Sequence, residues 1–175
     1  MAEFDLCFSQ FVLFNEAGKP PHYEVRPDPT KDDPGAQVCA GVNSAAFPED
    51  FAVIAALPID QRPAAVYAFY QKTYWNQYIA QLVSNAVAAV TMDAEVNQGI
   101  GKGVRFLQEA IPAAGGSVVT VDDVWGPITL AAANSVPAAS LVAAFQTVRK
   151  AAYKEIGGPD LAGWLARAAK IPPFA

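Results

Sequence analysis

One glutamate stands out near the start of the chain, because it follows an apolar run and precedes a glycine. The stretch FVLFNEAGK spans Phe11–Lys19 and places Glu16 two residues before Gly18. At 100° per residue Glu16 falls at the edge of the apolar stripe, so we expect its carboxyl group at the boundary between core and solvent. Loss of hydration there disfavours the charged form and raises a carboxyl pKa. Such an acid can donate a proton near neutral pH, although a solvated glutamate at a helix end is the commoner situation.

The composition argues against several classes of function. Seventeen acids against twelve bases give a net charge of -5 without a basic stripe, so no nucleic-acid partner is expected. One histidine and two cysteines are too few for a zinc site or a disulfide framework, and neither a metal nor a cofactor is expected. A bridge between Cys7 and Cys39 stays open, because the sequence does not give their geometry.

The sequence contains no run of about 18 apolar residues, so no membrane span is expected. Residues 1–16 lack a basic segment and carry Glu3 and Asp5 early, which does not fit a signal peptide. We therefore expect synthesis in the cytoplasm, with export or cell lysis needed for any action outside it.

Apolar periodicity and stop signals predict mostly helices around the glutamate. Residues 4–16 carry phenylalanines at spacings of three and four, and Gly18 provides a stop. Residues 18–58 are rich in proline and are expected to form a long loop with short strands. Further helices are predicted from Pro63 in a first turn, from Ser84 or Asn85 to Gly99, across GKGVRFLQEAI, from Pro127, and over 138–156 and 159–170.

Short motifs in a fixed order carry a family resemblance. They are EAG at 16–18, DPGA at 33–36, GV at 41–42, YQKTYW at 70–75, MDAEVNQG at 92–99, LQ at 107–108, DDVWGPIT at 122–129 and GWLAR at 163–167. Each is weak alone, but their order makes coincidence a poor explanation. Together they resemble glycoside hydrolase family 108, the lysozyme-like N-acetylmuramidases of bacteria and phages. Ala17 stands where the family's Glu-Gly-Gly motif has its first glycine.

The resemblance implies an all-α, lysozyme-like helical domain with a long loop or small β element after the first helix. It also implies a catalytic portion over residues 1–100. A helical portion over 101–175, similar to the family's peptidoglycan-binding part, would pack on it as one compact unit.

The resemblance also implies roles for individual residues. Glu16 would be the general acid, and Asp33 would be the second carboxylate that activates water or attacks the sugar. Asp32 and Asp28 are the other candidates, Asp33 also fits a plain turn, and a single glutamate is a further alternative. The predicted substrate-binding residues are His22, Tyr23, Tyr74, Asn97 and Gln98.

Four of these binding roles have a simpler alternative. A solvated loop position would explain His22, core packing would explain Tyr74, and helix capping would explain Asn97 and Gln98. Asp93 is expected to hold helix ends together rather than to perform chemistry.

The activity implied by the resemblance is hydrolysis of the β-1,4 bond between N-acetylmuramic acid and N-acetylglucosamine. The partner would be the glycan strands of peptidoglycan, in the periplasm or cell wall, with the chain acting as a phage endolysin or a secreted antibacterial effector. In the second case an immunity protein or a secretion machinery would be a further partner. The alternatives are a lytic transglycosylase and a non-catalytic peptidoglycan-binding or secretion-accessory protein.

Overall fold

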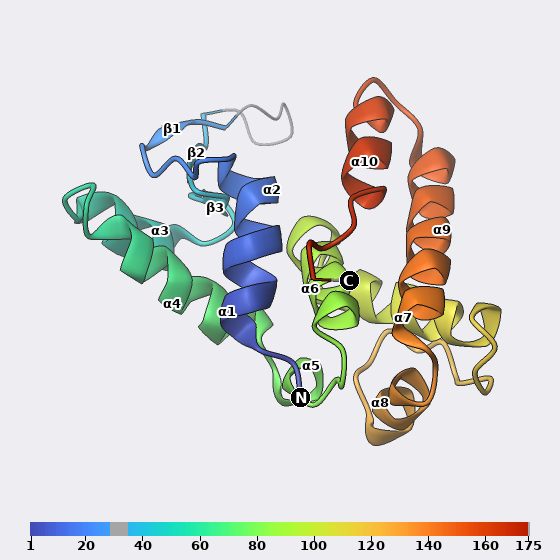
Figure 1. The fold of residues 1–175 in the computed structure, drawn as a ribbon. Coiled ribbons are helices and arrows are strands. Elements are labelled where there is room, and N and C mark those ends of the chain that lie inside the picture. Colours follow the sequence, from blue (N-terminus) through green and yellow to red (C-terminus); the bar gives the residue numbers. More distant parts are fainter. Residues whose placement is uncertain (29–34, 175) are drawn as a thin grey trace. The chain divides into compact units, whose positions relative to one another are not determined.

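A computed structural model describes residues 1–28 and 35–174, and within them the chain is mostly helical with one small sheet. This confirms the predicted all-α, lysozyme-like class with a small β element after the first helix. The helices, shown in chain order in Figure 1, are α1 (Phe4–Cys7), α2 (Leu13–Ala17), α3 (Pro48–Ala56), α4 (Arg62–Tyr74), α5 (Gln77–Ala80), α6 (Asn85–Gln98), α7 (Ile100–Ala113), α8 (Pro127–Asn134), α9 (Ala138–Ile156) and α10 (Leu161–Ala168). A π-helical turn, Phe8–Val12, joins α1 to α2.

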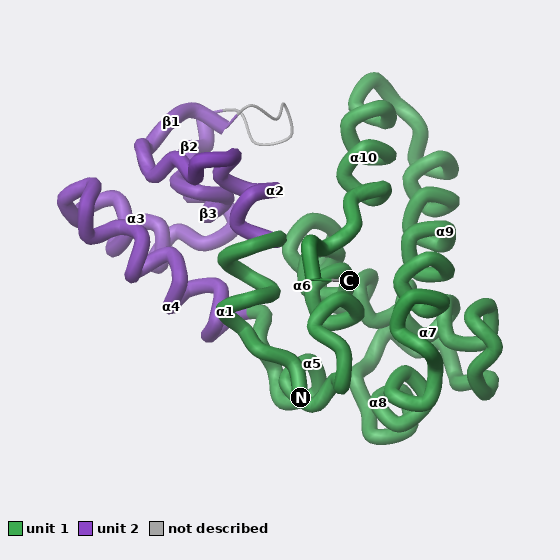
Figure 2. Tube along the Cα trace, in the orientation of Figure 1, with its two compact units in different colours: residues 1–11, 74–175 green, residues 12–73 purple. Residues whose placement is uncertain are grey.

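The chain forms two compact units (Figure 2). Unit 1 contains residues 1–11 and 74–175, and unit 2 contains residues 12–73. The division that the resemblance implies, a catalytic portion over 1–100 with a helical portion over 101–175 packed on it, stays a prediction.

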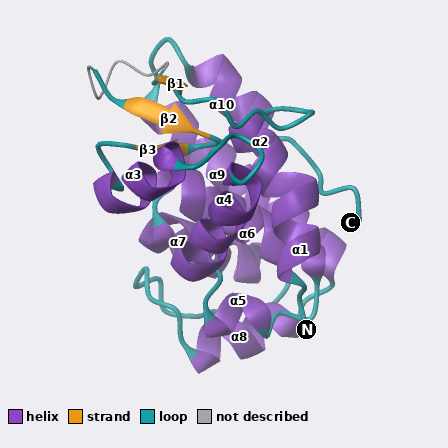
Figure 3. Ribbon diagram, turned by 90° about the vertical axis from the view of Figure 1, so that its left-hand side faces the viewer, coloured by secondary structure: helices purple, strands orange, loops and turns teal. Residues whose placement is uncertain are grey.

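Unit 2 is built around a small antiparallel sheet in the order β1-β2-β3, where β1 is Arg26–Pro27, β2 is Gln37–Cys39 and β3 is Val42–Asn43. Cys39 pairs with Val42, so only Ala40 and Gly41 lie between β2 and β3. Both have positive φ angles, 47° and 85°, which is the pattern of tight two-residue hairpins. Figure 3 shows the three strands with α3 beside them, and α3 contacts β2 and β3.

Helix α3 was not predicted, because the whole proline-rich stretch 18–58 was expected to be loop and strand. Its start carries local signals nonetheless. Pro48 occupies the first turn, where a missing N–H costs nothing, and Glu49 and Asp50 complement the positive end of the helix dipole. The ring of Phe47 packs edge-on against Phe69 of α4 at 4.9 Å between centroids. Packing of this kind stabilises a nine-residue helix that is too short to persist alone.

Unit 1 is built around α6, against which α1, α5, α7 and α9 pack. Residues 86–95 of α6 are all buried, and most are alanine or valine, so neighbouring helices can approach closely. The predicted limits of this helix are confirmed. The Ser84 hydroxyl caps its start by accepting from the Val87 N–H at 3.4 Å, and Gly99 ends it with a φ of 92°.

A buried glutamine holds the connector between α7 and α8. The Gln108 amide donates to Asp122 Oδ1 at 2.7 Å and to Thr129 Oγ1 at 3.2 Å, while its oxygen accepts from two backbone N–H groups of the connector. The connector then enters α8 at Pro127, where the helix start was predicted. All polar atoms of the Gln108 amide are therefore used within the fold, as burial demands.

Cys7 and Cys39 are both buried free thiols. Among the described residues no single helix combines the length and apolar composition needed to cross a membrane, while α8 and α9 meet both criteria only as a pair bent by 119°.

Candidate functional site

Glu16 lies in α2, and its side chain is half-buried, as the periodicity predicts. The helix ends at Gly18, whose φ of 83° is accessible to glycine at no steric cost. The β2–β3 hairpin closes over the carboxyl group. A Cβ atom added at Gly41 would lie 2.6 Å from Glu16 Oε2 and 2.8 Å from Glu16 Cβ. The glutamate side chain therefore packs directly on the hairpin backbone, and only glycine leaves room for it.

The side chain of Tyr70, from α4, also lies next to Gly41. Its buried hydroxyl donates to the carbonyl of Ala40 at 3.0 Å, and a Cβ added at Gly41 would also overlap that hydroxyl oxygen. Three segments far apart in the chain thus converge on one carboxyl group within unit 2. A carboxyl group that is partly removed from water and fixed in position suits proton donation to a bound substrate.

The predicted substrate-binding residues His22 and Tyr23 also lie in unit 2. The backbone N–H of His22 donates to the carbonyl of Ala17 at 2.8 Å, and its exposed ring approaches Glu24, with Nδ1 3.9 Å from Oε2. The Tyr23 ring is half-buried, and burial raises the pKa of its hydroxyl. Short chain connections hold both residues near the end of α2.

Arg62 fixes the backbone in this region. Its guanidinium group donates to the carbonyls of Tyr23 at 2.9 Å, Ala55 at 3.1 Å and Leu57 at 3.1 Å. The Cys39 thiol donates to the same Tyr23 carbonyl at 3.3 Å. These hydrogen bonds connect the segment after Glu16 to α3, α4 and the sheet, and they hold the backbone near the end of α2 in place.

Asp33, the predicted second carboxylate, lies outside the described residues together with Asp32. Asp28, the third candidate, is half-buried, and its carboxylate accepts from the Asn43 amide of β3. Its backbone N–H donates to Ala36 at 2.9 Å. Within residues 1–28 and 35–174 no group of three His, Cys, Asp or Glu side chains is arranged to hold a metal ion.

The remaining predicted binding residues lie in unit 1. Tyr74 is buried at the end of α4. The Asn97 side-chain oxygen accepts from the Tyr153 hydroxyl, and the Gln98 oxygen accepts from Arg149 Nε at 2.9 Å. Both amide oxygens are thus engaged inside the protein, and their use for sugar acetamido groups stays a prediction.

Asp93 joins three helices, as expected for a structural acid. Arg149 of α9 donates to it at 2.6 Å and Arg167 of α10 at 2.8 Å. Asp93 is fully buried, and Arg149 is 3% exposed. Burial alone would raise the pKa of Asp93, but the Arg167 and Arg149 guanidinium groups together hold it below its ordinary value.

Glu95 is a buried acid that the sequence analysis missed. Its Oε1 accepts from the indole N–H of Trp125 at 2.8 Å, while Oε2 is buried and has no hydrogen-bond partner among the described residues. A Cβ atom at Gly103 would overlap the Glu95 side chain. Gly103, inside α7, is therefore a sequence signal that α6 and α7 approach each other closely. Burial raises the pKa of Glu95 to about 8, even though the Trp125 hydrogen bond opposes this shift. Glu95 is fully buried, so it cannot touch a substrate in this state.

The protein is expected to lose stability as the pH rises from about 4.5 towards about 8, because Glu95 holds its proton in the folded chain but releases it in the unfolded one. The pKa of Glu95 is higher in the folded chain than in the unfolded one. The stability that the protonated Glu95 contributes is therefore complete below pH 4.5 and disappears as the pH rises past about 8. The loss is at most about 1.4 kcal/mol per pH unit. Glu95→Gln stays uncharged and should be the more stable protein at the alkaline end. Urea denaturation across this pH range measures the difference.

Glu155→Gln is the matched control for that series, since Glu155 is an exposed acid of the same unit. Its stability should follow the wild type at every pH. Parallel curves for the wild type and Glu95→Gln would contradict the assignment.

Two comparisons with known proteins show what the chain is similar to. The profile of the family described as glycosyl hydrolase 108 matches residues 22–99, which confirms the resemblance seen in the motifs. The match begins at His22 and so does not include Glu16. A solved structure of SagA from Brucella abortus is similar in fold, with a TM-score of 0.63 and 24% sequence identity, over 90% of this chain and 85% of that one. No curated protein matches the chain.

Proposed function

We propose that the chain is a muramidase, because its residues 22–99 match the family described as glycosyl hydrolase 108. It hydrolyses the β-1,4 bond between N-acetylmuramic acid and N-acetylglucosamine in peptidoglycan, with Glu16 as the general acid. The observation that carries the proposal is the half-buried Glu16 carboxyl group, held between the end of α2 and Gly41 of the hairpin.

The chemistry requires a proton on the leaving oxygen. Glu16 gives its proton to the glycosidic oxygen as the bond from that oxygen to the sugar C1 breaks, and positive charge develops on the sugar ring. Water then supplies the hydroxyl at C1 and a proton that restores the acid. The packing of Glu16 against Gly41 supports this role, because a donor must be fixed before the substrate arrives.

Asp33 is proposed as the second carboxylate, and its distance from Glu16 decides its task. A short separation suits direct attack on the sugar, and a longer one leaves room for an activated water. His22 and Tyr23 are proposed to contact the sugar near the cleaved bond. Tyr74, Asn97 and Gln98 are proposed to bind the glycan strand; the last two keep their amide N–H groups as donors, since only their oxygens accept the bonds described above.

Purified peptidoglycan tests the function directly. Incubation with the protein should lower the turbidity of the suspension, and mass spectrometry should find soluble muropeptides with reducing muramic acid ends. Anhydro-muramic ends would instead identify a lytic transglycosylase. Binding to the wall without any released fragment would establish the non-catalytic alternative.

The biological setting follows from the substrate. Glycan strands in the periplasm or cell wall are the proposed partner, reached by export or lysis, and an endolysin or an antibacterial effector would both act there. An immunity protein or a secretion machinery is a further proposed partner in the second case.

Gly41→Ala is expected to lower the rate of wall hydrolysis by about 100-fold, because the new methyl group would collide with Tyr70 and Glu16 and displace the acid. The substitution also strains the backbone by about 1–2 kcal/mol, since φ is 85° at this position. Activity and the free energy of unfolding are measured on the same preparation.

Gly115→Ala separates the two effects. Gly115 has a φ of 90° and nothing within 4 Å of an added Cβ, so this variant carries the backbone strain without the collision. It should lose only the stability that the backbone strain costs, and it should keep its activity. An equal loss of activity in both variants would mean that the close packing of Gly41 on Glu16 does not matter for catalysis.

A further inference from the structure

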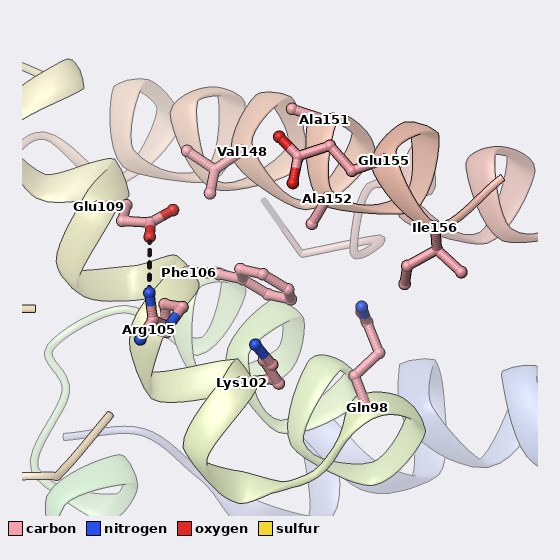
Figure 4. Close-up of a pocket in the computed structure, with 10 residues that line it drawn as sticks. All are labelled: Gln98, Lys102, Arg105, Phe106, Glu109, Val148, Ala151, Ala152, Glu155 and Ile156. Carbon is pink, nitrogen blue, oxygen red and sulfur yellow. Dashed lines mark ion pairs between the residues drawn. The ribbon is translucent and has the colours of Figure 1, made fainter. Parts of the chain in front are cut away.

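A pocket of about 750 Å³ lies in unit 1, between α7 and α9 (Figure 4). Its volume falls within the range of small-molecule sites, about 300–1,000 Å³. Lys102 and Phe106 come from α7, and Ala152, Glu155 and Ile156 come from α9. None of these residues takes part in the chemistry proposed for Glu16.

Two opposite charges face the pocket from its two walls. Figure 4 shows Lys102 on α7 and Glu155 on α9, both at the cavity. Both side chains are exposed, and neither has an ion-pair partner in the described part of the chain. The other charged pair at this site is already neutralised, because Arg105 lies 3.7 Å from Glu109 and 2.7 Å from Asp123. Lys102 and Glu155 are thus available to a ligand that carries both charges.

The space between these charges is apolar, with one oriented amide at its edge. Phe106 is buried beneath the pocket, and Ala152 and Ile156 form part of the α9 wall. Arg149 holds the oxygen of Gln98 at 2.9 Å, which orients the side-chain amide nitrogen towards the cavity, as Figure 4 shows. The pocket therefore offers a cation, an anion, a neutral N–H donor and an apolar floor.

We propose that this pocket binds the peptide stems of peptidoglycan rather than its sugars, an inference that rests on the proposed function for the source of the ligand. A stem peptide carries carboxylates for Lys102, a free amine for Glu155 and small aliphatic side chains for the apolar floor. The Gln98 amide, at the edge of the pocket, is left to the glycan strand from which the stem branches. A neutral N-acetyl sugar has no charge to match either wall, so it would leave both charges without compensation.

Calorimetric titration with a synthetic stem peptide tests the proposal. The probe is the N-acetylated tetrapeptide of alanine, isoglutamate, diaminopimelate and alanine, whose single amine lies on the diaminopimelate. Saturable binding is expected, and Lys102→Met and Glu155→Gln should each weaken it at least tenfold. Lys154→Met is the matched control, because Lys154 is an exposed lysine of α9 that does not line the pocket. Its affinity should equal that of the wild type.

A second peptide, with alanine in place of diaminopimelate, assigns the charges. It lacks the amine, so Glu155→Gln should no longer change its affinity, whereas Lys102→Met still should. The absence of saturable binding to the tetrapeptide would overturn the proposal, as would equal affinity in the wild type and both pocket variants. Binding of a chitin tetrasaccharide that these substitutions weaken would do the same.

The peptide contains no glycosidic bond, so the test is independent of catalysis. Glu16→Gln should bind it with wild-type affinity. A protein that binds the peptide and releases no wall fragments would refute the muramidase proposal alone, and a protein that cleaves the wall without binding the peptide would refute the pocket alone.

Discussion

Replacing Glu16 with glutamine is expected to lower the release of muropeptides from purified peptidoglycan by about 10²–10⁴-fold. Glutamine keeps the size of the side chain and its packing against Gly41, but it has no acidic proton to give to the leaving oxygen. The sugar bond would then have to break with an alkoxide-like leaving group, which is far less stable. Fragment release is quantified by chromatography at equal protein concentration.

Glu49→Gln is the control for this experiment, because Glu49 is an exposed glutamate of the same unit, in the first turn of α3. It should cleave at the wild-type rate. Circular dichroism and thermal unfolding establish that both variants are folded. If Glu16→Gln releases fragments as fast as Glu49→Gln, another residue donates the proton and the proposed mechanism is wrong.

The largest effect on stability is expected from Asp93→Asn, which should lower the free energy of unfolding by about 3–5 kcal/mol. The neutral amide would leave the guanidinium groups of Arg149 and Arg167 without their shared counter-charge, in a site where Arg149 is 3% exposed. An uncompensated buried cation costs far more than the pair itself contributes. Urea denaturation at neutral pH measures the loss.

Asp50→Asn provides the contrast. Asp50 pairs with Lys72 at 3.4 Å, but its side chain is 38% exposed and that of Lys72 is 73% exposed, so this variant should lose at most about 1 kcal/mol. Similar losses in the two variants would mean that burial does not govern the strength of the Asp93 network.

The Asp93 network also predicts a response to acid. The folded pKa of Asp93 is lowered, so its contribution is present above the ordinary value of 3.8 and disappears as the pH falls through the lower, folded value. Wild-type protein should therefore lose more stability on acidification than Asp93→Asn does. Glu95 acts in a different window, above pH 4.5, and does not obscure this difference.

The sequence determined the elements whose signals are local. Phenylalanine spacing and Gly18 predicted the helix that ends just after Glu16, and Pro127 marked the start of α8. Ser84 and Gly99 marked the two ends of α6. Such signals are readable because a cap, a stop or an apolar stripe depends on residues within a few positions. Helix α3 was missed because the prolines around it outweighed its own start signals.

Only the tertiary structure decided the surroundings of the acids. Gly41 and Tyr70 meet Glu16 from 25 and 54 positions away, and no local pattern brings the three together. Asp93 and Glu95 are two residues apart on α6, yet two arginines lower the pKa of one and burial raises that of the other to about 8. The sequence by itself therefore determined where the acids stand along the chain. Their protonation was decided by distant side chains, because burial and nearby charge depend on packing across the fold.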